Sequence, residues 1–143
     1  MISKADRRLL NETYRNAGMA IEAIYTTIDK IEDEELALEL TRQVGKFNSI
    51  QDRAEEELNI LGEKPDSSFL GKAMLKMQIK RKMMKNKGAS NVADMFIQGN
   101  TKGIVSTTRC MHDNLTAKKE YCELAGELVE FEHINIDRMK LFL

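Results

Sequence analysis

The sequence contains no tryptophan, a single proline and eight glycines in 143 residues, and no stretch alternates apolar with polar residues as a half-buried strand does. Alanine, leucine, glutamate, lysine and methionine are frequent instead, and these residues favour helices. A chain of this length can form one hydrophobic core without metals or disulfides. We therefore predict an all-α fold in a single domain, residues 1–143.

Long apolar runs are also missing. No window reaches the length of a membrane span, and the first residues lack the apolar core of a signal peptide. The charged residues balance to a net charge of -1, with a pI near 6.2, so no overall field attracts nucleic acid or an anionic membrane. We expect a cytoplasmic protein that binds neither.

Cysteine and the common signatures of catalysis are scarce. Cys110 and Cys122 lack a metal-binding spacing, which predicts free thiols in a reducing compartment. A redox pair is the alternative, because the two residues lie almost symmetrically on either side of a predicted turn. The sequence has no Gly-rich phosphate loop and no recognisable nucleophile motif.

Apolar residues at alternating steps of three and four predict four core helices, over residues 3–31, 33–61, 90–111 and 116–142. Asp33 is a plausible N-cap for the second helix, and Gly62 is placed to end it. Gly99, Gly103 and Ser106 share one face of the third, which allows a close approach to a neighbouring helix. The long segment between the second and third core helices contains Pro65, followed by a connector helix over residues 69–87.

The connector helix is basic and rich in methionine. Its basic residues are Lys72, Lys76, Lys80, Arg81, Lys82, Lys85 and Lys87, and its methionines are Met74, Met77, Met83 and Met84. Methionine adapts to varied apolar surfaces, and lysines can meet an acidic partner. The segment 72–87 is thus a candidate surface for a protein partner. The alternative is a strap that buries its methionines on the core and leaves its lysines in water.

The last helix contains two pairs of polar residues at the spacing of one turn. At 100° per residue, Glu132 and Asn135 fall in the centre of the apolar arc, whereas Glu130 lies opposite and His133 on the flank. A glutamate in a core stripe is costly unless it is paired, protonated or bound to a cation. Gln43 likewise interrupts the stripe of the second helix, so a buried hydrogen-bond network without chemistry is the competing interpretation.

Two helical hairpins joined by a long middle segment, with inward polar residues, resemble the ferritin-like superfamily of antiparallel four-helix bundles. This resemblance implies a site for two iron or manganese ions. The matching positions are Glu22, Asp94, Glu132 and Asn135, with Gln43 in the same polar layer. The superfamily's Glu-x-x-His motifs correspond here to Gln43-x-x-Lys46 and Glu132-x-x-Asn135, which contain no histidine. The chain is therefore similar to bacterial members of this fold whose metal motifs have decayed.

Two functions remain open at this stage. One is a non-enzymatic bundle that acts through a protein partner or through self-association, for example as a homodimer. The other, implied by the resemblance, is a di-metal oxidoreductase or metal-storage-like protein. If the middle segment crosses the bundle, Glu132 comes level with Glu22 and Gln43, as the metal site requires. If it does not cross, Glu132 lies near Gln51 and Tyr14.

Overall fold

The structure, a computed structural model, describes residues 2–143 and contains five α-helices and no strand in that range. The helices are α1 (Lys4–Thr27), α2 (Glu34–Ile60), α3 (Phe69–Lys85), α4 (Ala89–Asp113) and α5 (Lys119–Lys140), and a short 3-10 turn, η1 (Ile28–Lys30), follows α1. The predicted all-α fold class is confirmed. Across residues 2–143, no helix combines the length and the apolar character needed to cross a bilayer.

Local chemistry accounts for both ends of α2. The Asp33 side chain accepts a hydrogen bond from the Leu36 backbone N–H at 3.0 Å, so the predicted N-cap is confirmed. At the other end, Gly62 has φ +77°, a left-handed conformation that glycine adopts without steric cost. The Glu63 N–H then donates to the Leu58 carbonyl at 2.9 Å, which completes a Schellman-type ending.

Two helix ends differ from the sequence prediction by three or more residues, and the other ends differ by two residues or fewer. The first helix gives way to a 3-10 turn after Thr27, whose hydroxyl donates to the Ala23 carbonyl at 2.7 Å. The last helix begins at Lys119 rather than at residue 116, because the Ala117 N–H closes a turn onto the Asn114 carbonyl at 3.0 Å. Neither difference moves the inward face of a core helix.

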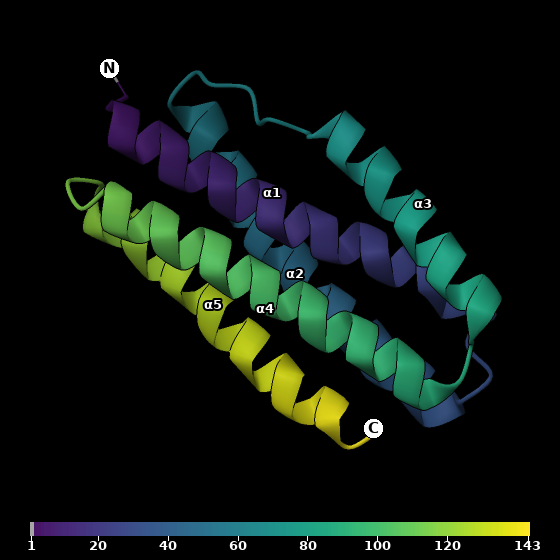
Figure 1. Cartoon of the computed structure of the whole chain (residues 1–143). Coiled ribbons are helices and arrows are strands. Elements are labelled where there is room, and N and C mark those ends of the chain that lie inside the picture. The colour runs from purple at the N-terminus through teal and green to yellow at the C-terminus, as the bar shows by residue number, and fades with distance from the viewer. Residues whose placement is uncertain (1) are drawn as a thin grey trace.

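Helix α1 is the central element, and it contacts α2, α3, α4 and α5 (Figure 1). It runs antiparallel to α4, since Asn16 meets Gly103 while Arg8, nearer the N-terminus, meets Cys110. It runs parallel to α5, whose Lys118 and Glu132 meet α1 in ascending order. Residues on α1 are therefore buried on several sides rather than along one stripe.

The middle segment carries the chain back along α1. Helix α3 lies on the outside of α1 and runs in the same direction, as the ion pair between Lys76 and Glu22 and the approach of Lys72 to Gly18 show. Helix α4 then starts at the end where α2 started, so α2 and α4 point the same way (Figure 1). This crossing path, which the sequence left open, leaves Glu132 and Gln43 lining one cavity, whereas Glu22, which was expected at the same level, does not line it.

The core fills the space between these helices with aliphatic side chains and one aromatic pair. Phe47 of α2 and Phe131 of α5 pack edge to face, with ring centroids 4.9 Å apart. Helix α3 contributes only Ile79 and Met83 as buried residues. Cys110, the one cysteine on α4, is a free thiol, like Cys122 on α5, and burial raises the pKa of the Cys110 thiol.

Gly103 sets the distance between α4 and the helices that face it. A Cβ atom at this position would overlap Glu132 Oε2 and lie 2.6 Å from Asn16 Oδ1. The predicted close approach of this face of α4 is confirmed at Gly103. At Gly99, one turn earlier, an added Cβ would meet nothing within 4 Å.

These two glycines form a matched pair for mutagenesis. We predict that Gly103→Ala lowers the free energy of unfolding by about 1–3 kcal/mol, because the methyl group must displace two polar side chains. Gly99→Ala should leave it unchanged or raise it by up to about 1 kcal/mol, through helix propensity alone. Urea denaturation of both variants measures the difference, and equal effects would contradict the close approach.

Candidate functional site

Glu132 is the most deeply buried acid among residues 2–143. It is 1% exposed, and Asn135, one turn later, is 0% exposed, so the predicted inward pair on α5 is confirmed. Glu130 and His133 are both exposed, as the helical phase indicated. The acid therefore sits among core side chains and not on the surface of the last helix.

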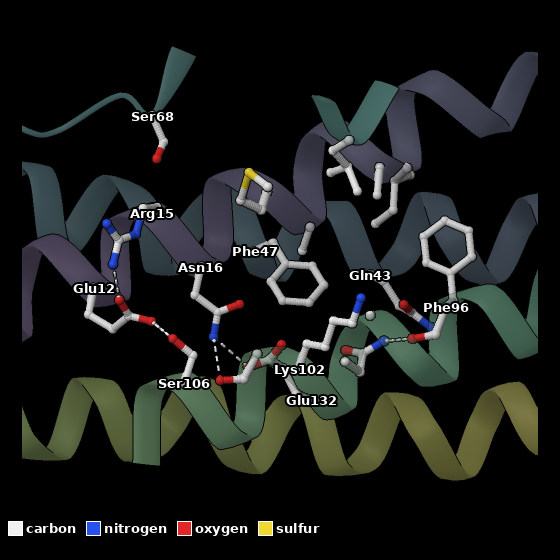
Figure 2. Close-up of a pocket in the computed structure, with 18 residues that line it drawn as sticks. Glu12, Arg15, Asn16, Gln43, Phe47, Ser68, Phe96, Lys102, Ser106 and Glu132 are labelled. Carbon is white, nitrogen blue, oxygen red and sulfur yellow. Dashed lines mark hydrogen bonds and ion pairs between the residues drawn. The ribbon is translucent and has the colours of Figure 1, made fainter. Parts of the chain in front are cut away.

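Asn16 is the main partner of Glu132. Its side-chain Nδ2 donates to Glu132 Oε1 at 2.8 Å, to Thr107 Oγ1 at 2.8 Å and to the Gly103 carbonyl at 3.2 Å. One amide group thus links α1, α4 and α5 (Figure 2). Gly103 lets the three helices come this close, because any side chain at this position would displace the Glu132 carboxyl group or the Asn16 amide.

The environment of Glu132 favours its uncharged form. The pKa of its carboxyl group is raised to about 8, mainly by burial. The hydrogen bond from Asn16 acts to lower this pKa, and the nearby Glu12 carboxylate acts to raise it. At neutral pH the Glu132 side chain is therefore mainly protonated. A buried glutamate without a cationic partner behaves in this way because the charged form loses its hydration.

A second acid, Glu12 of α1, lies close by but is neutralised. It is 6% exposed, forms an ion pair with Arg15 and accepts a hydrogen bond from the Ser106 hydroxyl. The two carboxyl groups therefore differ in character. Glu12 has a cationic partner in Arg15, whereas Glu132 has only a neutral amide as its partner.

A cavity of about 280 Å³ lies beside Glu132, between α1, α2 and α4, with the beginning of α3 at its mouth. Its walls are largely apolar and include Met19, Phe47, Leu75 and Phe96. Figure 2 shows Asn16, Gln43 and Glu132, which come from three different helices, converging on this space. The exposed side chains of Arg15 and Lys102 line its rim, so the cavity reaches the surface.

Two further amides line the cavity, and each has an oxygen without a partner. Gln43 donates from Nε2 to Glu39 Oε2 at 2.8 Å, and Asn100 donates from Nδ2 to the Phe96 carbonyl at 2.8 Å. The oxygens Gln43 Oε1 and Asn100 Oδ1 are buried and accept no hydrogen bond from residues 2–143. Such buried, unpartnered acceptors are uncommon in folded proteins.

Asn135 is a separate case. Both its Nδ2 and its Oδ1 are buried without a partner within the described chain, and the residue does not line the cavity. The network with Glu132 and Gln43 that the sequence suggested does not include it. Asn135 is therefore a source of instability in the core rather than part of a polar site.

The remaining positions of the proposed metal set lie elsewhere. Glu22 forms an ion pair with Lys76 of α3 at 2.8 Å, and Asp94 is exposed and accepts a hydrogen bond from Gln98 at 3.1 Å. Neither lines the cavity beside Glu132. Residues 2–143 hold no cluster of three or more His, Cys, Asp or Glu side chains suited to a metal ion. Binding of iron or manganese stays a prediction.

Sequence reasoning missed Asn16 and Asn100, the two amides contributed by α1 and α4. Asn16 does not belong to the apolar stripe of α1. It is partly buried because α4 and α5 cover a second face of that helix. Gly103 of α4 was the available signal, because a glycine on a buried helix face allows a neighbouring side chain to approach closely.

Comparison with known proteins adds no identification. No protein-family model matches this chain, and no match was found among curated proteins or among solved structures. The function therefore has to be argued from the geometry of the helices and of the cavity.

The state of Glu132 has a consequence for stability. Because the folded protein keeps a proton that the unfolded chain loses near its ordinary pKa of 4.5, stability falls as the pH rises from about 4.5 to about 8. We predict that the free energy of unfolding of Glu132→Gln rises relative to that of the wild type across this range, by up to about 1.4 kcal/mol per pH unit. Urea denaturation between pH 5 and pH 9 gives the curves.

The exposed neighbour Glu130 provides the control. Glu130→Gln should follow the wild-type pH dependence, because that carboxyl group is in water in both states. A wild-type curve that runs parallel to the Glu132→Gln curve would show that the acid is charged in the folded protein.

Asn135 allows a test of what an unpartnered buried amide costs in stability. We predict that Asn135→Leu raises the free energy of unfolding by about 1–2 kcal/mol, since it replaces an unpartnered buried amide by an apolar group of similar size. Asn59→Leu, on the exposed side of α2, controls for the gain in helix propensity. A loss of stability in Asn135→Leu would mean that the amide has a partner.

Proposed function

We propose that the protein is a ferritin-like four-helix bundle without catalytic activity that binds an acidic helical partner on the outer face of α3. The observation that carries this proposal is an apolar stripe on α3 that faces solvent. The stripe consists of Leu70, Met74, Met77 and Met84, which are 77%, 61%, 57% and 85% exposed.

The two faces of α3 serve different purposes. Ile79 and Met83 point to α1 and are only 3% and 2% exposed, so they attach the helix to the bundle. The stripe lies on the opposite face. Its residues are spaced by four, three and seven positions, like the apolar residues at a coiled-coil interface. A strap that only covered the core would have no use for this second apolar face.

The charge of α3 selects the kind of partner. The helix carries six basic residues and no acidic one, although the whole chain has a net charge of -1. Within residues 2–143 only Lys76 of these six forms an ion pair, with Glu22. A second copy of α3 would bring like charges together, whereas an acidic amphipathic helix would satisfy both the stripe and the lysines.

The crossing path of the middle segment supports the ferritin-like part of the proposal, because that superfamily also has its second and third core helices parallel. The separation of Glu22 and Asp94 from the cavity beside Glu132 favours a bundle that does not catalyse di-metal chemistry. Methionine side chains on the stripe suit binding to helices of varied sequence.

Peptide binding tests the proposal directly. We expect a fluorescent amphipathic peptide of roughly three heptads, with leucine at the core positions and glutamate elsewhere, to bind saturably and more weakly at high salt. The triple variant Met74→Ser, Met77→Ser and Met84→Ser should lose at least about tenfold in affinity, because each serine removes apolar contact area. Fluorescence anisotropy measures both.

The matched control places the same change elsewhere on the surface. Leu38→Ser with Ile60→Ser, at exposed positions on α2, should bind the peptide like the wild type. Equal affinity of the α3 triple variant, equal binding of a lysine-containing version of the peptide, or tighter binding to anionic vesicles would each contradict the proposal. So would a homodimer that the triple variant disrupts.

A further inference from the structure

The cavity beside Glu132 extends along the contact between α1 and α4. Its lining residues run from Glu12 to Ile24 on α1 and from Phe96 to Ser106 on α4. At a rise of about 1.5 Å per residue, these two stretches are roughly 15–18 Å long. Because the volume over this length is only about 280 Å³, the cavity suits an extended chain better than a compact group.

The cavity opens into a second space of different polarity. Its own walls are mainly apolar, with Met19, Leu75 and Phe96 among them. A wider groove of about 740 Å³ is lined mostly by exposed residues of α1 and α4. The cavity and the groove share the lining residues Glu12, Arg15, Lys102 and Ser106. A ligand can therefore place an apolar part in the cavity and a polar part in the groove.

The groove carries positive charge. Its basic residues are Arg8, Arg15, Lys102 and Arg109, and its acidic residues are Glu12 and Asp113. Glu12 is already neutralised, because it pairs with Arg15 and accepts a hydrogen bond from the Ser106 hydroxyl. The other three basic residues are exposed and form no ion pair among residues 2–143. An anion in the groove thus meets free cations and breaks no existing pair.

We infer that the cavity and the groove together bind a small amphiphilic anion, a carboxylate on an unbranched apolar chain. The chain lies in the cavity against Met19, Leu75 and Phe96, where it replaces water on apolar walls. The carboxylate stays where the two spaces meet, beside the free ammonium group of Lys102. A volume of about 280 Å³ has room for about eight carbon atoms, if each takes as much as a water does in the liquid, about 30 Å³.

Simpler ligands use only part of this arrangement. A bare anion such as phosphate meets the cations of the groove and leaves the apolar walls uncovered. An organic cation meets a groove of like charge, and a neutral alcohol gains nothing from Lys102. The contact between Asn16 and Glu132 is closed by its own hydrogen bond, so the ligand needs no group for it. The outer stripe of α3 takes no part, so this site is separate from the proposed partner surface.

Calorimetric titration with sodium octanoate tests this inference, at constant ionic strength and below the concentration at which octanoate forms micelles. We expect saturable binding of one octanoate per chain. Hexanoate should bind at least about tenfold more weakly, since each buried methylene contributes about fourfold in affinity. Octylammonium, with the same chain and the opposite charge, should bind at least about tenfold more weakly, and 1-octanol severalfold more weakly. NMR shifts of the Met19 and Leu75 methyl groups should locate the chain without any mutation.

Two matched pairs of variants separate the chain from the charge. An added Cβ meets nothing within 4 Å at either Gly99 or Gly45, but only Gly99 lines the cavity. Gly99→Leu should therefore weaken octanoate binding at least about tenfold, while Gly45→Leu should bind it like the wild type. Lys102→Glu should weaken binding at least about fivefold, and Lys119→Glu, an exposed position outside both spaces, should not change it.

Several results would overturn the inference. They are equal affinity for octanoate and octylammonium, equal affinity for hexanoate and octanoate, unchanged affinity in both Gly99→Leu and Lys102→Glu, and shifts confined to residues outside the cavity. The triple variant of the α3 stripe should bind octanoate like the wild type. A large loss of octanoate binding in that variant would place the chain on the outer face of α3 and would also overturn the inference.

Discussion

The contact between Asn16 and Glu132, made across Gly103, is the constraint on which the arrangement of α1, α4 and α5 depends. One amide nitrogen donates to all three of its neighbours within 3.2 Å, and the backbone of α4 can reach it because residue 103 has no side chain. A buried acid in this setting is tolerated because it stays protonated. The interior therefore gains a fixed polar point while the cost of a buried charge is avoided.

The cavity follows from the same contact. Gly103 of α4 lets the side chains of Asn16 and Glu132 approach closely, and a space with apolar walls remains beside that point. The path of the middle segment places the start of α3 over the mouth of this space, through Ser68 and Leu75. The inner face of α3 thus belongs to the bundle, while its outer stripe and its lysines remain in solvent.

Features that depend only on one helix burying one face were predicted correctly from the sequence. The helical class, the N-cap at Asp33 and the inward direction of Glu132 and Asn135 all follow from local periodicity. Asn16 and Asn100 could not be found in this way. Helix α1 is covered by four other helices, so an off-stripe residue such as Asn16 is decided by the packing of distant segments.

The positions of Glu22 and Asp94 show the same limit. Their alignment with a metal site rested on a resemblance in helix order, which does not specify which face of each helix turns inward. The path of α3 decided the matter for Glu22, because Lys76 meets it on the outside of α1.

The measurement that tests this account most directly is the pH titration of the Glu132 side chain, followed by NMR of its labelled carboxyl carbon in the folded protein. An uncharged acid held by Asn16 predicts a single transition with a pKa of about 8. A transition near the ordinary glutamate value of 4.5 would contradict it, because the acid would then be charged in the core at neutral pH.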